Sequence, residues 1–396
     1  MFVLSAIALL QPKLEIDEYY NHLPNLVSCY EKGVIETIFG DNYLSANTPL
    51  PYILTYVPHY IINLKPNIYS ARIFNAIIAY LTIFIFYLLL KRNGDSNFLL
   101  EKTLLFLFYP YFLKPAFTYY MAVYGVLFFL AALFYFDKYR SNWLLVGIML
   151  GSAVMSQQFY LIAFLPFGLY LLNEEKYEYS IAALKKAILL IIPVIILFLP
   201  LAIGWGGLTH KNFRFHEIRF QTTHITSILV TIGMVFIPYL IIRAKTFKIK
   251  TVIILLIPAI LLVLFAYPVI ILRGGEGAIT GMSFRAIDFT GKIIPILPFL
   301  VKTTIVSLGL LLLVDLYTIM KSDYEKLLFY IICSFIIGFT FNTILAERHL
   351  LPLIATILLF ILPKIQNRVF IRLWLGFQIV IGLVYYYYYL YIKAIY

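Results

Sequence analysis

Charged residues are scarce in this 396-residue chain, where they make up 13% of the sequence against 62% hydrophobic residues. The mean hydropathy of +0.91 lies far outside the range of soluble domains and indicates a polytopic membrane protein. The alternation of polar and apolar residues that a transmembrane β-barrel requires is also missing. Because only helices and closed barrels satisfy backbone polar groups in lipid, the expected fold is an all-α integral membrane protein.

Several familiar motifs are missing as well. The two cysteines, Cys29 and Cys333, cannot form a disulfide framework and are interpreted as structural. No Walker loop, G-x-G-x-x-G fingerprint or G-x-S-x-G elbow occurs, so a nucleotide-sugar or ATP site has no support. No H-x-x-x-H or H-E-x-x-H motif occurs, and adjacent side chains such as Asp17 and Glu18 diverge by about 100° on a helix. The sequence therefore predicts neither a metal nor a cofactor.

The net charge of +12 comes from basic residues dispersed between hydrophobic segments, so they indicate membrane topology and contact with anionic lipid rather than nucleic-acid binding. About thirteen apolar segments predict 11–13 transmembrane helices in one polytopic domain over residues 1–396. The segments are 1–11, 72–90, 102–116, 117–136, 143–156, 157–172, 184–204, 223–242, 250–272, 294–320, 325–346, 347–363 and 369–392.

Short basic loops alternate with longer loops of mixed charge, which is the positive-inside pattern. This predicts a cytoplasmic N-terminus and an outer first loop over residues 12–71, in the cell membrane of a prokaryote or the endoplasmic reticulum of a eukaryote. The first apolar segment has roughly half of the twenty residues that a span requires. Either the chain starts upstream or this helix thins the bilayer; the segment also resembles a signal peptide without its basic leader.

The first outer loop has its own organisation. Apolar residues between 19 and 39 recur at helical spacing, which predicts a helix lying in the membrane interface. Residues 40–60 are rich in Pro, Asn and Tyr and predict an ordered loop. Asp17 and Glu18 precede this helix; they are candidate catalytic acids, although a solvated helix cap is the alternative.

Two later outer loops contain cationic and imidazole side chains. Charges this close to a bilayer are costly unless paired or solvated, and they suit a phosphate head group. The alternative for residues 205–222 is a solvated connecting loop. The alternative for residues 346–353 is a turn in which Glu347 pairs with the basic side chains. The candidates are Lys211, Arg214 and Arg219 in residues 205–222, and Arg348 and His349 in residues 346–353.

These residues resemble the membrane-embedded GT-C class of glycosyltransferases. "IDEYYNHLPNLVSCYEKG" and "DNYLSANTPLPYIL" are most similar to the family that adds the terminal alpha-1,2-glucose to the lipid-linked N-glycan precursor. The matching residues are Asp17, Glu18, His22 (displaced by one position), Pro24, Thr48, Pro49 and Tyr52. Weaker matches are Gln157 in "MSQQFYL", where Ser156 replaces an arginine, and Arg348-His349 in "AERHLLPL". The chain is shorter than these glucosyltransferases, so the sugar and the acceptor stay open.

The resemblance implies a large outer first loop with interface helices and an active site on the non-cytoplasmic face. A hexose would pass, with inversion, from a polyprenyl-phosphate donor to a hydroxyl of a lipid-linked or other outer-face saccharide. Asp17 would be the general base and Glu18 a second acid that orients the acceptor or a basic side chain. Roles follow for the other candidates: Arg348, His349, Lys211, Arg214 and Arg219 at the donor phosphate, and His22, Thr48 and Gln157 in positioning the acceptor or the loop.

A transporter or flippase for a lipid-linked saccharide is the alternative function. Transporters usually contain internal repeats and ionisable groups near the middle of the membrane. No repeat is evident here, and Lys302 and Asp315 are the charges expected deep within a segment. A structural membrane protein without a ligand site is a third possibility, but it leaves the outer acid and base clusters unexplained.

Overall fold

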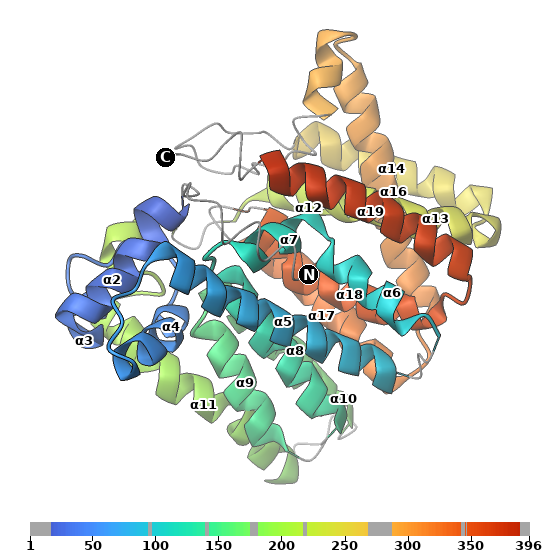
Figure 1. Cartoon of the computed structure of the whole chain (residues 1–396). Helices are drawn as coiled ribbons and strands as arrows, with labels where there is room; N and C mark the ends of the chain where they lie inside the picture. The colour runs from blue at the N-terminus through green and yellow to red at the C-terminus, as the bar shows by residue number, and fades with distance from the viewer. Residues whose placement is uncertain are drawn as a thin grey trace. The chain divides into compact units, whose positions relative to one another are not determined.

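The computed structural model describes residues 17–93, 97–138, 142–174, 181–216, 220–267, 287–341, 345 and 347–388, without the side chains of 137, 138, 174, 214–216, 347 and 348. Over these residues the chain forms helices and connecting turns with no β-strand (Figure 1), which confirms the all-α prediction. The predicted segment 1–11 lies outside the described residues. The chain divides into two compact units, residues 1–216 with 362–396 (unit 1) and residues 217–361 (unit 2).

Unit 1 is built on four helices that pack in chain order. Helix α5 packs on α8, α8 on α9, and α9 on α11, as Figure 1 shows. The C-terminal helix α19 packs on α6 and α7. The bounds are α5 Ile68–Arg92, α6 Leu99–Leu107, α7 Pro110–Phe117, α8 Ala122–Lys138, α9 Trp143–Val154, α10 Phe164–Glu174, α11 Ile181–Trp205 and α19 Arg368–Tyr387; η2 Gln158–Ala163, η3 Lys211–His216 and η7 Leu362–Lys364 are short 3₁₀ helices.

The first loop folds into four short helices, namely the π-helix η1 (Glu18–His22), α2 (Leu23–Lys32), α3 (Val34–Phe39) and α4 (Leu50–Ile61). The prediction of one helix over 19–39 was wrong at Gly33, whose φ of 92° and ψ of 156° are open to glycine alone. Residues 50–61 were expected to be loop but are helical. Proline fits the first turn at Pro51, and the buried Tyr52, Thr55 and His59 follow at helical spacing.

The segments on either side of residue 115 are divided differently from the prediction. Segments 102–116 and 117–136 were expected to meet at residues 116 and 117, but both of these residues lie inside α7. Helices α7 and α8 are instead separated at residues 118–121, where the axis bends by 112°. Thr118 is extended there, with φ −104° and ψ 161°, so the following backbone N–H groups leave the helical pattern and are available to other acceptors.

Unit 2 centres on α16, against which α12 and α14 pack, while α17 packs against α18. At the α12–α16 crossing, a Cβ on Gly233 would meet the Ile305 carbonyl oxygen, and one on Gly309 would meet the Leu229 carbonyl oxygen. Small residues let the two backbones approach closely here, as is common between membrane helices. The bounds are α12 Thr222–Val235, α13 Ile237–Arg243, η4 Ala244–Thr246, α14 Ile249–Phe265, η5 Thr290–Lys292, α16 Leu297–Ile319, α17 Asp323–Phe339, η6 Glu347–Leu350 and α18 Leu351–Ile361.

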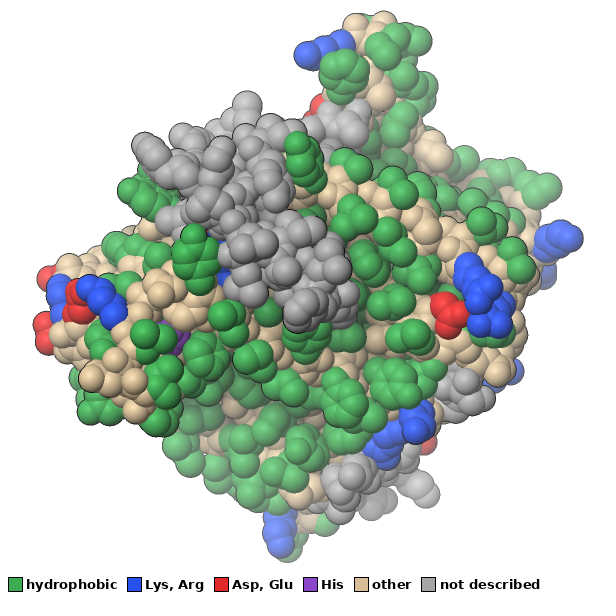
Figure 2. All heavy atoms as spheres, in the orientation of Figure 1, with side chains coloured by type: hydrophobic (Ala, Val, Ile, Leu, Met, Phe, Trp, Pro, Cys, Tyr) green, Lys and Arg blue, Asp and Glu red, His purple; other side chains and the backbone are tan. Residues whose placement is uncertain are grey.

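Several helices are long and apolar enough to cross a membrane, which indicates a multi-pass membrane protein. Four described helices qualify singly (α5, α11, α16 and α19), and up to six spans result if the bent pairs α7–α8 and α12–α13 each count as one. Large hydrophobic side chains are exposed along these helices, and they cover much of the face in Figure 2. The count of 11–13 spans stays a prediction, because the other apolar helices contain only 10–17 residues.

Candidate functional site

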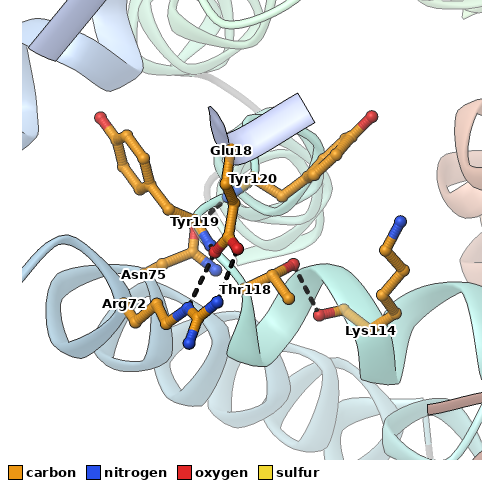
Figure 3. A network of polar contacts seen from close by, with 7 residues as sticks. All are labelled: Glu18, Arg72, Asn75, Lys114, Thr118, Tyr119 and Tyr120. Atoms are coloured by element: carbon orange, nitrogen blue, oxygen red, sulfur yellow. Dashed lines mark hydrogen bonds and ion pairs between the residues drawn. The ribbon is translucent and has the colours of Figure 1, made fainter. Parts of the chain in front are cut away.

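The Glu18 carboxylate is the best-anchored group of the acidic motif. Its side chain is fully buried and accepts from Arg72 of α5 through two bonds, Nε to Oε1 at 2.9 Å and Nη2 to Oε2 at 2.7 Å. The backbone N–H of Tyr119 donates to Oε1 at 2.6 Å. Figure 3 shows this carboxylate directed at Arg72. A buried charge requires such partners, so Glu18 joins the start of η1 to α5 and to the α7–α8 connection.

Asp17 lies next to Glu18 in sequence but has a different environment. Its side chain is partly exposed and accepts a hydrogen bond from the Tyr120 hydroxyl, Oη to Oδ2, at 2.6 Å. Asn21 Nδ2 lies 3.4 Å from Oδ1. The two acids have therefore diverged, as adjacent positions on a helical backbone do.

The α7–α8 connection contributes one donor to each acid, the Tyr119 N–H to Glu18 and the Tyr120 hydroxyl to Asp17. Asn75 of α5 donates through Nδ2 to the Pro115 carbonyl at 2.5 Å, and its Oδ1 accepts from the Tyr120 N–H at 3.3 Å. The rings of Tyr119 and Tyr120 point apart in Figure 3. The Lys114 ammonium lies 5.5 Å from the centroid of the Tyr120 ring, within cation–π distance. Asn75 and Lys114 thus help to set where Tyr120 presents its hydroxyl to Asp17.

His22 is buried beneath this motif. Its Nδ1 lies 2.8 Å from the Tyr52 hydroxyl of α4, and its ring makes an edge contact with Tyr120 at 5.0 Å between centroids. Burial raises the pKa of the Tyr52 phenol above its usual value, so this hydroxyl keeps its proton at neutral pH. The His22–Tyr52 contact fixes η1 against α4, and a role of His22 in positioning an acceptor stays a prediction.

Thr48 and Gln157 are far apart in sequence and meet at the end of α9. Thr48 Oγ1 donates to the Val154 carbonyl at 2.7 Å, and Gln157 Nε2 donates to Asn47 Oδ1 at 3.2 Å. The Leu50 N–H donates to the Met155 carbonyl at 2.9 Å. The bonds from Thr48 and Leu50 satisfy carbonyl groups that the end of α9 leaves unbonded. Both residues hold the first loop in place, whereas contact with an acceptor sugar stays a prediction for them.

Residues 205–212, at the start of the basic 205–222 segment, belong to unit 1 and pack on the first loop. Trp205 Nε1 donates to the Ile38 carbonyl at 2.9 Å, and Asn212 Nδ2 to the Asp41 carbonyl at 2.8 Å. The Lys211 ammonium pairs with the Asp41 carboxylate. This bond and its positive charge lower the pKa of Asp41. Lys211 thus lies exposed beside the first loop, and its role at a phosphate stays a prediction.

His210 is buried between two aromatic rings of the same region, with centroid distances of 5.4 Å to Tyr43 and 5.6 Å to Trp205. Burial lowers the pKa of this imidazole, although the Gly40 carbonyl acts in the opposite direction. The neutral form is therefore favoured in the folded chain. A neutral histidine in this position is part of the packing rather than a cationic phosphate ligand.

The other predicted phosphate ligands are placed less fully. The side chains of Arg214 and Arg348, and Arg219 as a whole, lie outside the described residues. His349 is partly buried in η6 of unit 2. Their convergence on one phosphate stays a prediction. Within the described residues, no group of three or more His, Cys, Asp or Glu side chains gathers in an arrangement suited to a metal.

Sequence reasoning missed four residues that complete the acidic site: Arg72, Asn75, Lys114 and Tyr120. One signal was present, since Arg72 and Asn75 are polar residues near the start of an otherwise apolar span and lie on one helix face. Tyr120 carried no comparable signal, because the chain contains 33 tyrosines.

No family model matches the chain, and no curated protein matches it.

Proposed function

We propose that this chain is a membrane-embedded glycosyltransferase of GT-C type. It moves a hexose from a polyprenyl-phosphate donor to a hydroxyl of a saccharide acceptor, with inversion. The observation that carries the proposal is the divergence of the acid pair: Glu18 is buried in an ion pair with Arg72, while Asp17 is partly exposed and held by Tyr120. An anchored acid beside an accessible one is an arrangement suited to a positioned general base.

The proposed role of Asp17 is to accept the proton of the acceptor hydroxyl as that oxygen attacks the anomeric carbon. The base must come within about 2.6–3.2 Å of this oxygen, and such assistance is worth about 10²–10⁴ in rate. The Tyr120 hydroxyl restricts the carboxylate to one orientation through its 2.6 Å bond. Glu18 acts through position only, because its side chain is fully buried and its carboxylate is held by Arg72 and the Tyr119 N–H.

The leaving group in this proposal is a lipid phosphate, which needs nearby positive charge as its bond to the sugar breaks. The sequence candidates are Arg348, His349, Lys211, Arg214 and Arg219. Lys114 is an additional candidate, because its buried ammonium lies against the ring of Tyr120, the residue that bonds to Asp17.

The test is transfer of labelled hexose from defined polyprenyl-phosphate donors by the purified full chain in vesicles. Asp17→Asn preserves size and removes the basic oxygen, so transfer should fall by about 10²–10⁴ while donor binding and unfolding temperature are retained. Asp323→Asn is the matched control, since Asp323 is an exposed acid paired with Lys326 in unit 2. Full activity of Asp17→Asn together with good folding would remove Asp17 from the reaction.

A transporter for a lipid-linked saccharide is the second candidate, favoured by two buried charges in α16. Lys302 pairs with Asp288 at 2.6 Å and Asp315 pairs with Arg243 at 2.9 Å. Ionisable groups within a membrane helix often mark a transport pathway. If vesicles show protein-dependent translocation of a labelled lipid-linked saccharide but no transfer from any donor, the transporter is the correct class. Lys302→Met should then abolish translocation.

A further inference from the structure

A hollow lies on unit 2 where α12 and α13 bend by 66° relative to each other. The bend occurs at Phe236, two residues before Pro238, because proline has no N–H to continue the helical hydrogen bonds across the break. The cavity beside it has a volume of about 420 Å³, and every lining side chain is apolar. Its walls come from α13, the segment 244–249, the start of α14 and α16, with Ile237, Ile241, Ile253, Leu308 and Leu311 among the lining residues.

Three exposed lysines are sequence neighbours of residues that line this cavity. The lining residues Ala244, Phe247 and Ile249 alternate along the chain with the exposed Lys245, Lys248 and Lys250. Residues 222–267 contain no acidic residue. No described acidic side chain pairs with these three lysines, so their positive charge is open to an outside anion.

The wall between α13 and α16 is held by a buried carboxylate. Asp315 accepts from Arg243 at both oxygens, Nη2 to Oδ1 at 2.9 Å and Nε to Oδ2 at 3.2 Å, and from the Tyr239 hydroxyl at 2.6 Å. Asp315 lies one turn beyond the lining residue Leu311 on α16. The bidentate pair keeps α13 in place over α16, and the charge of Arg243 is used in doing so.

We propose that this hollow binds an anionic membrane phospholipid, with one acyl chain in the cavity and the head-group phosphate among Lys245, Lys248 and Lys250. A wholly apolar lining offers no polar group to orient a water-soluble ligand, whereas an acyl chain needs none. Basic side chains at the end of membrane helices attract anionic head groups. The site requires a membrane but does not depend on the glycosyltransferase proposal.

The experiment uses the purified full chain in vesicles that contain trace phosphatidylglycerol with a photoreactive acyl chain. A parallel sample carries the same acyl chain on phosphatidylcholine. After illumination, labelled peptides are mapped by mass spectrometry. Labelling by phosphatidylglycerol within residues 237–253 and 308–311 should exceed that by phosphatidylcholine by about tenfold or more, since each lysine at an anionic surface raises affinity about fivefold. Unlabelled phosphatidylglycerol should compete.

Variants separate the two halves of the site. The triple change of Lys245, Lys248 and Lys250 to Gln should bring phosphatidylglycerol labelling down to the phosphatidylcholine level. Leu311→Phe, which fills the cavity, should lower labelling by both lipids. The control Lys321→Gln/Lys326→Gln removes two lysines of unit 2 that do not adjoin the cavity lining and should change neither.

Three outcomes of the labelling experiment overturn the proposal. Equal labelling of the wild-type chain by the two lipids would mean an apolar crevice without head-group selection. Adducts confined to other helices would place the lipid elsewhere. Stronger competition by a polyprenyl phosphate than by phosphatidylglycerol would mean that the occupant is a different class of lipid. These comparisons need no variant, so they stand even if a substituted chain fails to fold.

Discussion

Removing the guanidinium of Arg72 should destabilise unit 1 by about 3–5 kcal/mol, the usual cost of leaving one partner of a buried ion pair alone. In Arg72→Met, the Glu18 carboxylate stays fully buried and loses the donors at Nε and Nη2. The hydrogen bond from the Tyr119 N–H to Glu18 Oε1 is retained. One hydrogen bond from a backbone N–H does not offset the desolvation of a carboxylate, so most of the loss of about 3–5 kcal/mol in the free energy of unfolding should be observed.

The double variant Glu18→Gln/Arg72→Met gives the sharper result. Glutamine at position 18 still offers a carbonyl oxygen to the Tyr119 N–H, and neither position 18 nor position 72 then carries a buried charge. We therefore expect the double variant to lose only about 1–2 kcal/mol, less than either single variant, because removing both charges removes the desolvation cost as well. The double variant should thus lose much less stability than the sum of the losses in the two single variants, which means a large favourable coupling energy between Glu18 and Arg72.

The measurement is equilibrium unfolding of the purified chain in mixed micelles, followed by tryptophan fluorescence. All three tryptophans lie in unit 1, so the signal reports the unit that contains the pair. Arg368→Met is the matched control: Arg368 pairs with Glu101 at 3.3 Å in the same unit but is half exposed, and its loss should cost at most about 1 kcal/mol. Additive losses in the Glu18/Arg72 double variant would refute the reasoning.

Three further predictions concern the first loop and residues that contact it. Gly33→Ala should destabilise the chain by about 1–3 kcal/mol because φ is 92° at this residue. The control Gly376→Ala lies in α19, where a Cβ meets open space, and should be neutral or stabilising. Equal effects of the two variants in thermal unfolding would contradict this. Burial lowers the pKa of His210, so its contribution to stability is present above about pH 6.5, the pKa in the unfolded chain, and is lost as the pH falls below it. His210→Gln should therefore flatten the decrease in unfolding temperature between pH 7.5 and 5, and an unchanged slope would exclude His210 as its source. Tyr120→Phe removes the 2.6 Å hydrogen bond that orients the Asp17 carboxylate. It should lower kcat for hexose transfer about tenfold or more with little change in donor KM. Transfer at the wild-type rate would contradict the role of Tyr120 in orienting Asp17.

Much of the helix pattern could be read from the sequence, since lipid permits few alternatives to helices for apolar segments of this length. Helix α5 begins at Ile68, close to the predicted start of segment 72–90. Asn67 and Ser70 form a capping box, and both belong to the local sequence. The breaks in the first loop were harder to predict. Gly33 ends α2 through a positive φ, while α4 forms because its buried face, with Tyr52 and His59, finds partners elsewhere in unit 1.

The sequence by itself determined that this chain is an α-helical membrane protein and that an acid pair opens its first loop. Composition decided the first point, because burying so much apolar surface in water-soluble form is not possible for a chain with so few charges. Only the tertiary structure decided that Glu18 is buried and Asp17 partly exposed. That difference depends on Arg72 and Tyr120, which are 54 and 103 residues from their respective partners. Contacts between distant residues follow from how helices pack, and helical periodicity alone contains no information about them.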